Sequence, residues 1–140
     1  MDLNPADCVS YRLRRAARVA AKYYDAALKP LNLRNTQFTL LAALSILEDT
    51  SIGNLSKELA IDGTTLTRNL DVLFRRGLIE DQPDDDGRVR NIRLTQFGKD
   101  TYQHALPLWQ EAQTSIVEQL GASEWQTMIT QLKDIENASL

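Results

Sequence analysis

A short polar run near the middle of the chain carries side chains suited to nucleic acid. It consists of Thr64, Thr65, Thr67, Arg68 and Asn69. Hydroxyl, guanidinium and carboxamide groups are those that hydrogen-bond to base edges and phosphates. We therefore take these five as candidate DNA contacts. The alternative is a surface helix whose polar side chains only remain hydrated.

A second basic segment follows the sequence Pro83-Asp84-Asp85-Asp86-Gly87. Its arginines are Arg88, Arg90 and Arg93, of which we take Arg88 and Arg90 as DNA contacts. An arginine at the tip of a hairpin can enter a narrow minor groove, where the negative potential is strongest. We expect Asp86 to pair with an arginine and support the tip of this wing. The alternative is a charged strand edge that prevents pairing with other chains.

The elements that position these residues follow from apolar spacing and turn chemistry. Asp62 is a good N-cap for a helix that carries the polar run, and Gly77 is placed to end that helix. Asp86-Gly87 between two mixed apolar and polar stretches favours a hairpin. The expected elements are helices over 54–60 and 64–76, a turn over 61–63, and strands over 78–81 and 89–94. This order predicts a helix-turn-helix followed by a wing.

Longer helices flank this unit. Apolar residues at steps of three and four predict helices over 9–28, 35–48, 96–120 and from 123 onward. The second should be the buried central helix, capped by Asn35 or Thr36, and Thr95 and Ser123 should cap the last two. Apolar stripes on the terminal helices favour a surface for a second copy of the chain. The fold class is mostly α with a small β wing.

Composition excludes several classes of protein. The chain has 140 residues, a net charge of −3, one histidine and one cysteine. Neither a disulfide nor a cysteine-rich metal site is possible within one chain, and His104 has no partner at a spacing useful for catalysis. We expect no cofactor, no metal, no membrane span and a cytoplasmic protein that is not an enzyme. Seven basic against three acidic residues over 1–34 leave room for a basic face on an acidic body.

The run from Asp62 to Ile79, and Asp86-Gly87-Arg88 followed by Leu94-Thr95 and Gly98, resemble the recognition helix and wing of the MarR family. The resemblance implies one domain over 1–140, with a winged helix-turn-helix core over about 35–98. It implies dimerisation helices over about 7–30 and 96–138. It further implies a homodimer that binds double-stranded DNA with a pseudo-palindromic operator. We expect a repressor released by a small-molecule effector.

Two groups of residues are candidates for sensing an effector. A small aromatic or phenolic molecule would bind between the dimer helices and the winged core, lined by Tyr11, Arg15, Tyr23, Phe38 and Trp109. The alternative is redox sensing by Cys8, whose setting resembles that of the organic-hydroperoxide sensors of the family. Those sensors carry two tyrosines where this chain has Asn35 and Phe38, so we expect Cys8 to be a small side chain buried at an interface. A third hypothesis is a winged protein-interaction module that does not bind DNA.

Overall fold

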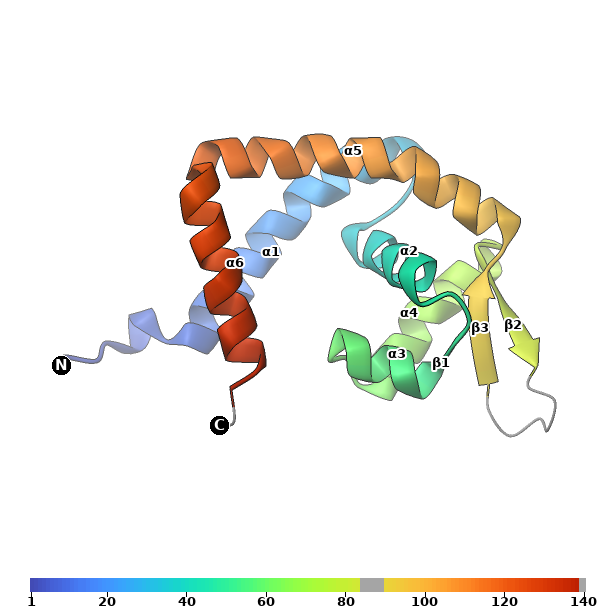
Figure 1. Ribbon diagram of the computed structural model, residues 1–140, viewed down its shortest axis with the longest axis horizontal. Coiled ribbons are helices and arrows are strands. Elements are labelled where there is room, and N and C mark those ends of the chain that lie inside the picture. Colours follow the sequence, from blue (N-terminus) through green and yellow to red (C-terminus); the bar gives the residue numbers. More distant parts are fainter. Residues whose placement is uncertain (84–89, 139–140) are drawn as a thin grey trace.

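The computed structural model describes residues 1–83 and 90–138, which form an arch with a winged unit under one end (Figure 1). The helices are α1 (Val9–Leu28), α2 (Asn35–Leu47), α3 (Ile52–Leu59), α4 (Gly63–Arg75), α5 (Gln96–Leu120) and α6 (Ala122–Glu136). The strands are β1 (Thr50–Ser51), β2 (Ile79–Pro83) and β3 (Arg90–Leu94), and 3₁₀ turns lie at Pro5–Asp7 and Lys29–Leu31. We call α2 to β3 the winged unit. The predicted order of elements and the mostly α class with a small β wing are confirmed.

Leucines fill the core of the winged unit. Those that are almost completely buried are Leu40, Leu41, Leu44, Leu55, Leu66, Leu70, Leu73 and Leu78. Leu28 from the end of α1 and Ala105 from α5 reach into the same cluster. The predicted central place of α2 is confirmed, although Ile46 on its outer side is 79% exposed. Because α4 contributes three of these leucines, its opposite face is held toward solvent.

The sheet is antiparallel with the strand order β1-β3-β2. The pairing of β2 with β3 runs from Ile79 opposite Leu94 to Pro83 opposite Arg90. The predicted hairpin is therefore confirmed, with its first strand extended to Pro83. The turn residues Asp84–Asp86 and Arg88 lie outside the described residues.

Thr95 links the ends of α4, β3 and α5. Its hydroxyl donates to the Gly77 carbonyl oxygen at 2.6 Å and accepts from the Gly98 N–H at 3.0 Å. Gly77, which ends α4, has a φ of 71° that favours glycine. A Cβ on Gly98 would lie 2.0 Å from the Leu78 carbonyl oxygen. The predicted cap by Thr95 is confirmed. Gly98 follows it at this spacing because any side chain there would collide with Leu78.

The start of α2 is held by Asp25 on α1 and by Gln37 within α2, and Arg34 is the residue at the cap position, so the predicted cap by Asn35 or Thr36 is wrong. The Asp25 carboxylate on α1 accepts from the Asn35 N–H at 2.6 Å, and Gln37 Oε1 accepts from the Arg34 N–H at 2.9 Å. Arg76, which follows α4, donates to the carbonyl oxygens of Leu31 and Asn32 at 3.2 and 2.6 Å. The segment between α1 and α2 is thereby held at one place by α1 and at another by the residue that follows α4.

The outer helices form the span of the arch (Figure 1). The Tyr24 hydroxyl on α1 donates to Gln113 Oε1 on α5, and burial raises the pKa of Tyr24. The helix α5 continues through Pro107 and changes direction along its length. Gly121, with a φ of 93°, turns the chain into α6. Ser123 lies inside α6, so its predicted role as the cap is wrong.

Candidate nucleic-acid interface

The first turn of α4 is fixed by Asp62. Its carboxylate accepts from the Thr65 N–H at 2.9 Å and from the Thr65 hydroxyl at 2.8 Å. These two hydrogen bonds, the backbone one first, lower the pKa of Asp62. The cap therefore stabilises the helix above the ordinary pKa of an aspartate and is lost as the pH falls through the lowered pKa. Asp62 as the predicted cap of this helix is confirmed.

The five polar residues predicted on α4 lie on its outer face. Thr64, Thr65, Thr67 and Arg68 are exposed, and Asn69 is half-buried. The hydroxyl hydrogen of Thr67 is used on the Gly63 carbonyl oxygen at 2.8 Å, as that of Thr65 is on Asp62. Within 1–83 and 90–138, Arg68 makes no side-chain hydrogen bond or ion pair, and Thr64 makes none either. Arg68 is therefore a cation on this face that a phosphate or base can bind without displacing an acid among the described residues.

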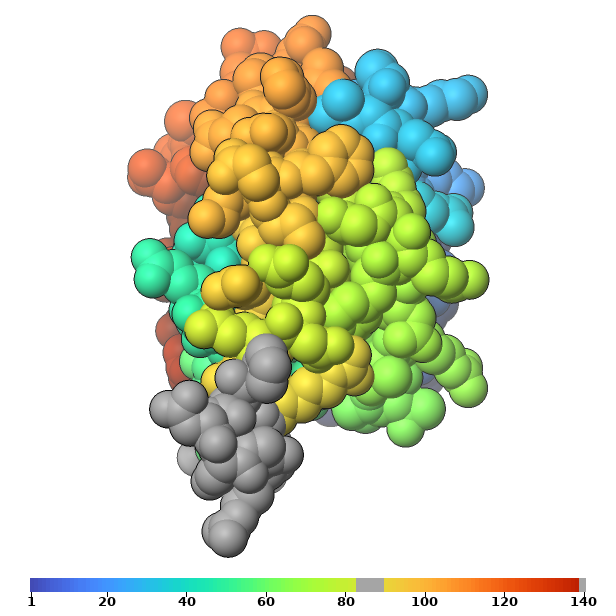
Figure 2. Space-filling view, turned by 90° about the vertical axis from the view of Figure 1, so that its right-hand side faces the viewer, coloured from blue at the N-terminus to red at the C-terminus, as the bar shows by residue number. Residues whose placement is uncertain are grey.

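The described arginines of the wing are held by acidic side chains on the neighbouring strand. Arg90 Nε lies 2.6 Å from Asp81 Oδ1, and the guanidinium carbon lies 4.8 Å from the Phe74 ring centroid. Arg93 bonds Glu80 and Gln82, each at 3.0 Å. Figure 2 looks onto this end of the molecule, where α4 and the strands form one continuous surface. Asp86 and Arg88 lie outside the described residues.

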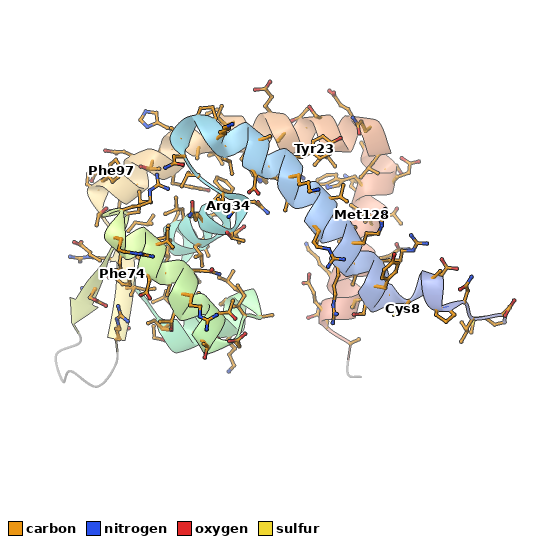
Figure 3. All side chains as sticks on the ribbon, turned by 180° about the vertical axis from the view of Figure 1, so that it is seen from behind. Cys8, Tyr23, Arg34, Phe74, Phe97 and Met128 are labelled. Atoms are coloured by element: carbon orange, nitrogen blue, oxygen red, sulfur yellow. The ribbon has the colours of Figure 1, made fainter. Side chains whose placement is uncertain are left out.

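Sequence reasoning missed the acids and the aromatic ring that hold these arginines. The register places Glu80 directly opposite Arg93, and opposite charges on paired strands are the signal that could have found this pair. Phe74 could not be found in this way because it approaches from α4. It lies at the end of that helix next to the strands (Figure 3).

The comparisons agree with this geometry. The model of the MarR family matches residues 31–88. The transcriptional regulator MosR of M. tuberculosis, solved in complex with DNA, is 34% identical, with 96% of this chain and 100% of that chain covered and a TM-score of 0.81. This chain belongs to the MarR family. Members of the family are transcription regulators rather than enzymes.

Two further MarR-family structures are similar over nearly the whole chain. A cysteine-to-serine mutant of E. coli MarR, complexed with operator DNA, is 25% identical, covers 96% of this chain and 99% of that chain, and has a TM-score of 0.85. BpsR of Bordetella bronchiseptica, whose DNA binding is regulated by 6-hydroxynicotinic acid, is 22% identical. It covers 99% of this chain and 100% of that chain with a TM-score of 0.87, and at this identity the likeness supports the winged fold alone.

The candidates for a MarR-type effector pocket are spread over two places. Phe38 is buried and stacks on Trp109, with the ring centroids 5.6 Å apart. Tyr11, Arg15 and Tyr23 lie on exposed parts of α1. Twelve residues of helix separate the two tyrosines, which corresponds to about 18 Å. In the single chain these five residues therefore do not surround one cavity.

A different hollow lies between the end of α2, β3 and the start of α5. Its volume is about 490 Å³, and its lining includes Glu48, Asp49, Lys99 and Tyr102. Tyr102 also contacts Phe38, with ring centroids 5.6 Å apart. The hollow thus meets the aromatic cluster that separates α2 from α5. Its size is that of a small-molecule site.

Cys8 lies at the start of α1, far from the wing (Figure 3). It is exposed in the single chain, so its predicted burial needs a second protomer. His104 is exposed on α5, as expected. Over the described ranges, no group of three or more His, Cys, Asp or Glu side chains is placed to hold a metal, and no helix is long and apolar enough to span a bilayer.

Proposed function

We propose that this MarR-family regulator is a homodimeric repressor that inserts α4 into the major groove of its operator. The observation that carries the proposal is the outer face of α4, where Thr64 and Arg68 project from a helix fixed by Asp62 and by three buried leucines. The recognition helix of a helix-turn-helix reads bases with its N-terminal residues. The solved complex of the similar regulator MosR with DNA supports DNA binding by this chain.

The contacts we assign are Thr64, Thr65, Thr67, Arg68 and Asn69 in the major groove and Arg88 in the adjacent minor groove. Thr65 and Thr67 have already donated their hydroxyl hydrogens, so they act on DNA as acceptors. Arg68 supplies a positive charge in the first half of this helix face. We propose that a bound dimer covers two half-sites about 10 bp apart and represses transcription by occupying the operator.

The dimer is supported by the apolar side chains that the single chain leaves exposed on its outer helices. On α1, α5 and α6 these include Val9, Val19, Tyr23, Leu120, Met128 and Ile135. None of the residues of α6 is buried. Large apolar side chains that are left exposed on neighbouring helices are typical of a protein interface. We place the second copy of the chain on this surface.

We further propose that a small aromatic or phenolic molecule releases the repressor by binding between α2 and α5. The support is the hollow at Tyr102, which meets the stack of Phe38 on Trp109. A ligand there would move α5 relative to the winged unit. Screening benzoic and phenolic acids for release of DNA tests this step, with Lys99→Ala expected to weaken the effect of an acid and Lys133→Ala expected to leave it unchanged.

The experiment for DNA binding is a gel-shift titration on fragments selected from random-sequence DNA. Wild type should bind one pseudo-palindrome per dimer. Arg68→Ala should weaken binding by roughly ten- to a hundredfold, because a base or phosphate loses its cation. The control is Lys133→Ala, which removes one exposed positive charge from α6. Equal affinity of wild type and Arg68→Ala at every salt concentration would remove Arg68 from the interface, and a wild type that binds no fragment would favour the interaction-module hypothesis.

A further inference from the structure

Arg90 is the first residue of β3, and its side chain binds a carboxylate on the neighbouring strand. Its Nε donates to Asp81 Oδ1 at 2.6 Å and its Nη2 donates to Asp81 Oδ2 at 3.4 Å. Pro83 is the paired residue of Arg90, so Asp81 lies two positions along β2 on the same face. Two parallel bonds to one carboxylate fix the plane of the guanidinium.

The same guanidinium also reaches the recognition helix. Its carbon lies 4.8 Å from the centroid of the Phe74 ring, a distance typical of a cation over an aromatic face. Phe74 is half-buried in the last turn of α4 and packs against the leucine core. Arg90 thus contacts β2 and α4 while belonging to β3. These contacts line a groove of about 560 Å³ between the helix and the wing.

The acid that is bound to Arg90 disfavours a phosphate there. Asp81 neutralises Arg90 directly, and Asp71 and Arg75 on α4 line the same groove with opposite charges. The hydrogen bond from Arg90 to Asp81, together with the fields of Asp81 and Asp71, raises the pKa of Arg90. A phosphate would have to displace one carboxylate and approach a second. Arg68, by contrast, is exposed without an acidic partner among the described residues.

We infer that Arg90 is a positioning residue, which holds the wing at a fixed angle to α4 and does not itself bind DNA. This inference rests on the proposed function, because it assumes that α4 and the wing enter neighbouring grooves together. Fixing the angle in the free protein removes a cost of ordering the wing when DNA binds. The sequence-based assignment of Arg90 as a DNA contact is thereby replaced by a role in the geometry of the site.

The two possible roles of Arg90 predict opposite changes in DNA affinity for one substitution. If Arg90 bound phosphate, Asp81 would compete with the DNA, and Asp81→Asn would tighten binding. If Arg90 positions the wing, Asp81→Asn releases it and weakens binding by about two- to fivefold, the size expected for a half-exposed ion pair. Glu80→Gln is the matched control, because it removes one negative charge from the adjacent position of β2 without touching Arg90. The ratio of the two affinities removes the general effect of charge.

Salt dependence and side-chain shape give a second readout. If Arg90 bound a phosphate, Arg90→Gln would lower the slope of log K against log salt by about one unit, whereas replacing a positioning residue leaves the slope unchanged. Arg90→Lys separates the roles while it keeps the charge. A lysine can still bind a phosphate but cannot make the paired bonds to Asp81 while lying flat on Phe74. We expect Arg90→Lys to bind as weakly as Arg90→Gln, and Phe74→Leu to be weakened as well.

The outcomes separate this inference from the proposed function. Wild type that binds no selected fragment at low salt contradicts the proposed function. Wild type that binds, together with tighter binding by Asp81→Asn relative to Glu80→Gln or full affinity in Arg90→Lys, overturns the positioning role. Thermal unfolding of each variant is measured alongside. Equal melting temperatures with weaker DNA binding support the inference.

Discussion

The winged unit and the long helices around it bury their apolar side chains in different ways. In the winged unit, Leu66, Leu70 and Leu73 are almost completely buried within one chain. In α6, Trp125, Ile129 and Leu132 are only half-buried, and Ile135 is exposed. The winged unit therefore has the core it needs to fold as one protomer. The outer helices have an apolar surface that a second copy would complete.

The largest effect should come from truncating the core of the winged unit. Leu70→Ala should lower the free energy of unfolding by about 2–5 kcal/mol, because it removes buried methyl groups and leaves a cavity. Urea denaturation followed by circular dichroism measures the loss. Leu132→Ala on α6 is the comparison, and its effect should depend on protein concentration while that of Leu70→Ala should not. Equal, concentration-independent losses would contradict the division into two regions.

A smaller loss should come from the contact between the winged unit and α5. Gly98→Ala should destabilise the fold by about 1–3 kcal/mol, because the added methyl group overpacks against a backbone that cannot easily move. The obstacle is the Leu78 carbonyl oxygen, 2.0 Å from the position of a Cβ. Gly53→Ala in α3 is the matched control, since nothing lies within 4 Å of its Cβ position. An unchanged melting temperature for Gly98→Ala would show that this contact can open freely.

Charge on α6 should alter assembly without unfolding the winged unit. Ile135→Asp should shift the protein from dimer to monomer in analytical ultracentrifugation, because a carboxylate would have to be buried in the apolar interface. Thr130→Asp adds the same charge at an exposed position on the opposite side of α6 and should remain dimeric. A dimer that survives Ile135→Asp would place the interface elsewhere.

The smallest effect is expected at Cys8. Both wild type and Cys8→Ser should stay bound to operator at peroxide concentrations near that of the protein. The side chain of Cys8 is exposed at the start of α1, so peroxide can reach it. We expect no release because, by the resemblance to the hydroperoxide sensors, Asn35 and Phe38 stand where those sensors carry the two tyrosines. Reversible release of wild type alone, measured by gel shift before and after reductant, would establish Cys8 as a redox sensor.

Local chemistry explains what the sequence predicted correctly. The caps at Asp62 and Thr95 and the end of α4 at Gly77 depend on residues at most three positions apart. The outward placement of Thr64 and Arg68 follows from the leucine spacing of the same helix. Such features are visible in a single stretch of chain because one side chain and its own backbone decide them.

Features decided by tertiary approach were missed. The start of α2 is held by Asp25, ten residues earlier on another helix. Arg76 bonds carbonyl oxygens 44 and 45 residues away, and neither spacing has a sequence signature. The prediction that Arg90 contacts DNA rests on its charge, and the ring of Phe74 beneath its guanidinium could not be predicted because it depends on how α4 meets the wing. For the same reason, none of the predicted effector residues lines the hollow at Tyr102. Phe38 only contacts Tyr102 from behind the lining.

The helix α5 belongs to both regions, and this has a mechanical consequence. Its first turns are clamped in the winged unit at Gly98, Thr101 and Ala105, and the remainder runs along the arch to Leu120. The 15 residues beyond Ala105 form a lever arm of about 22 Å, so a tilt of roughly five degrees at the clamp displaces its tip by about 2 Å. In a dimer joined at these tips, the same tilt changes the separation of the two recognition helices. Because hydrogen bonds to base edges tolerate only a few tenths of an ångström, such a tilt would take one of the two helices out of register with its half-site.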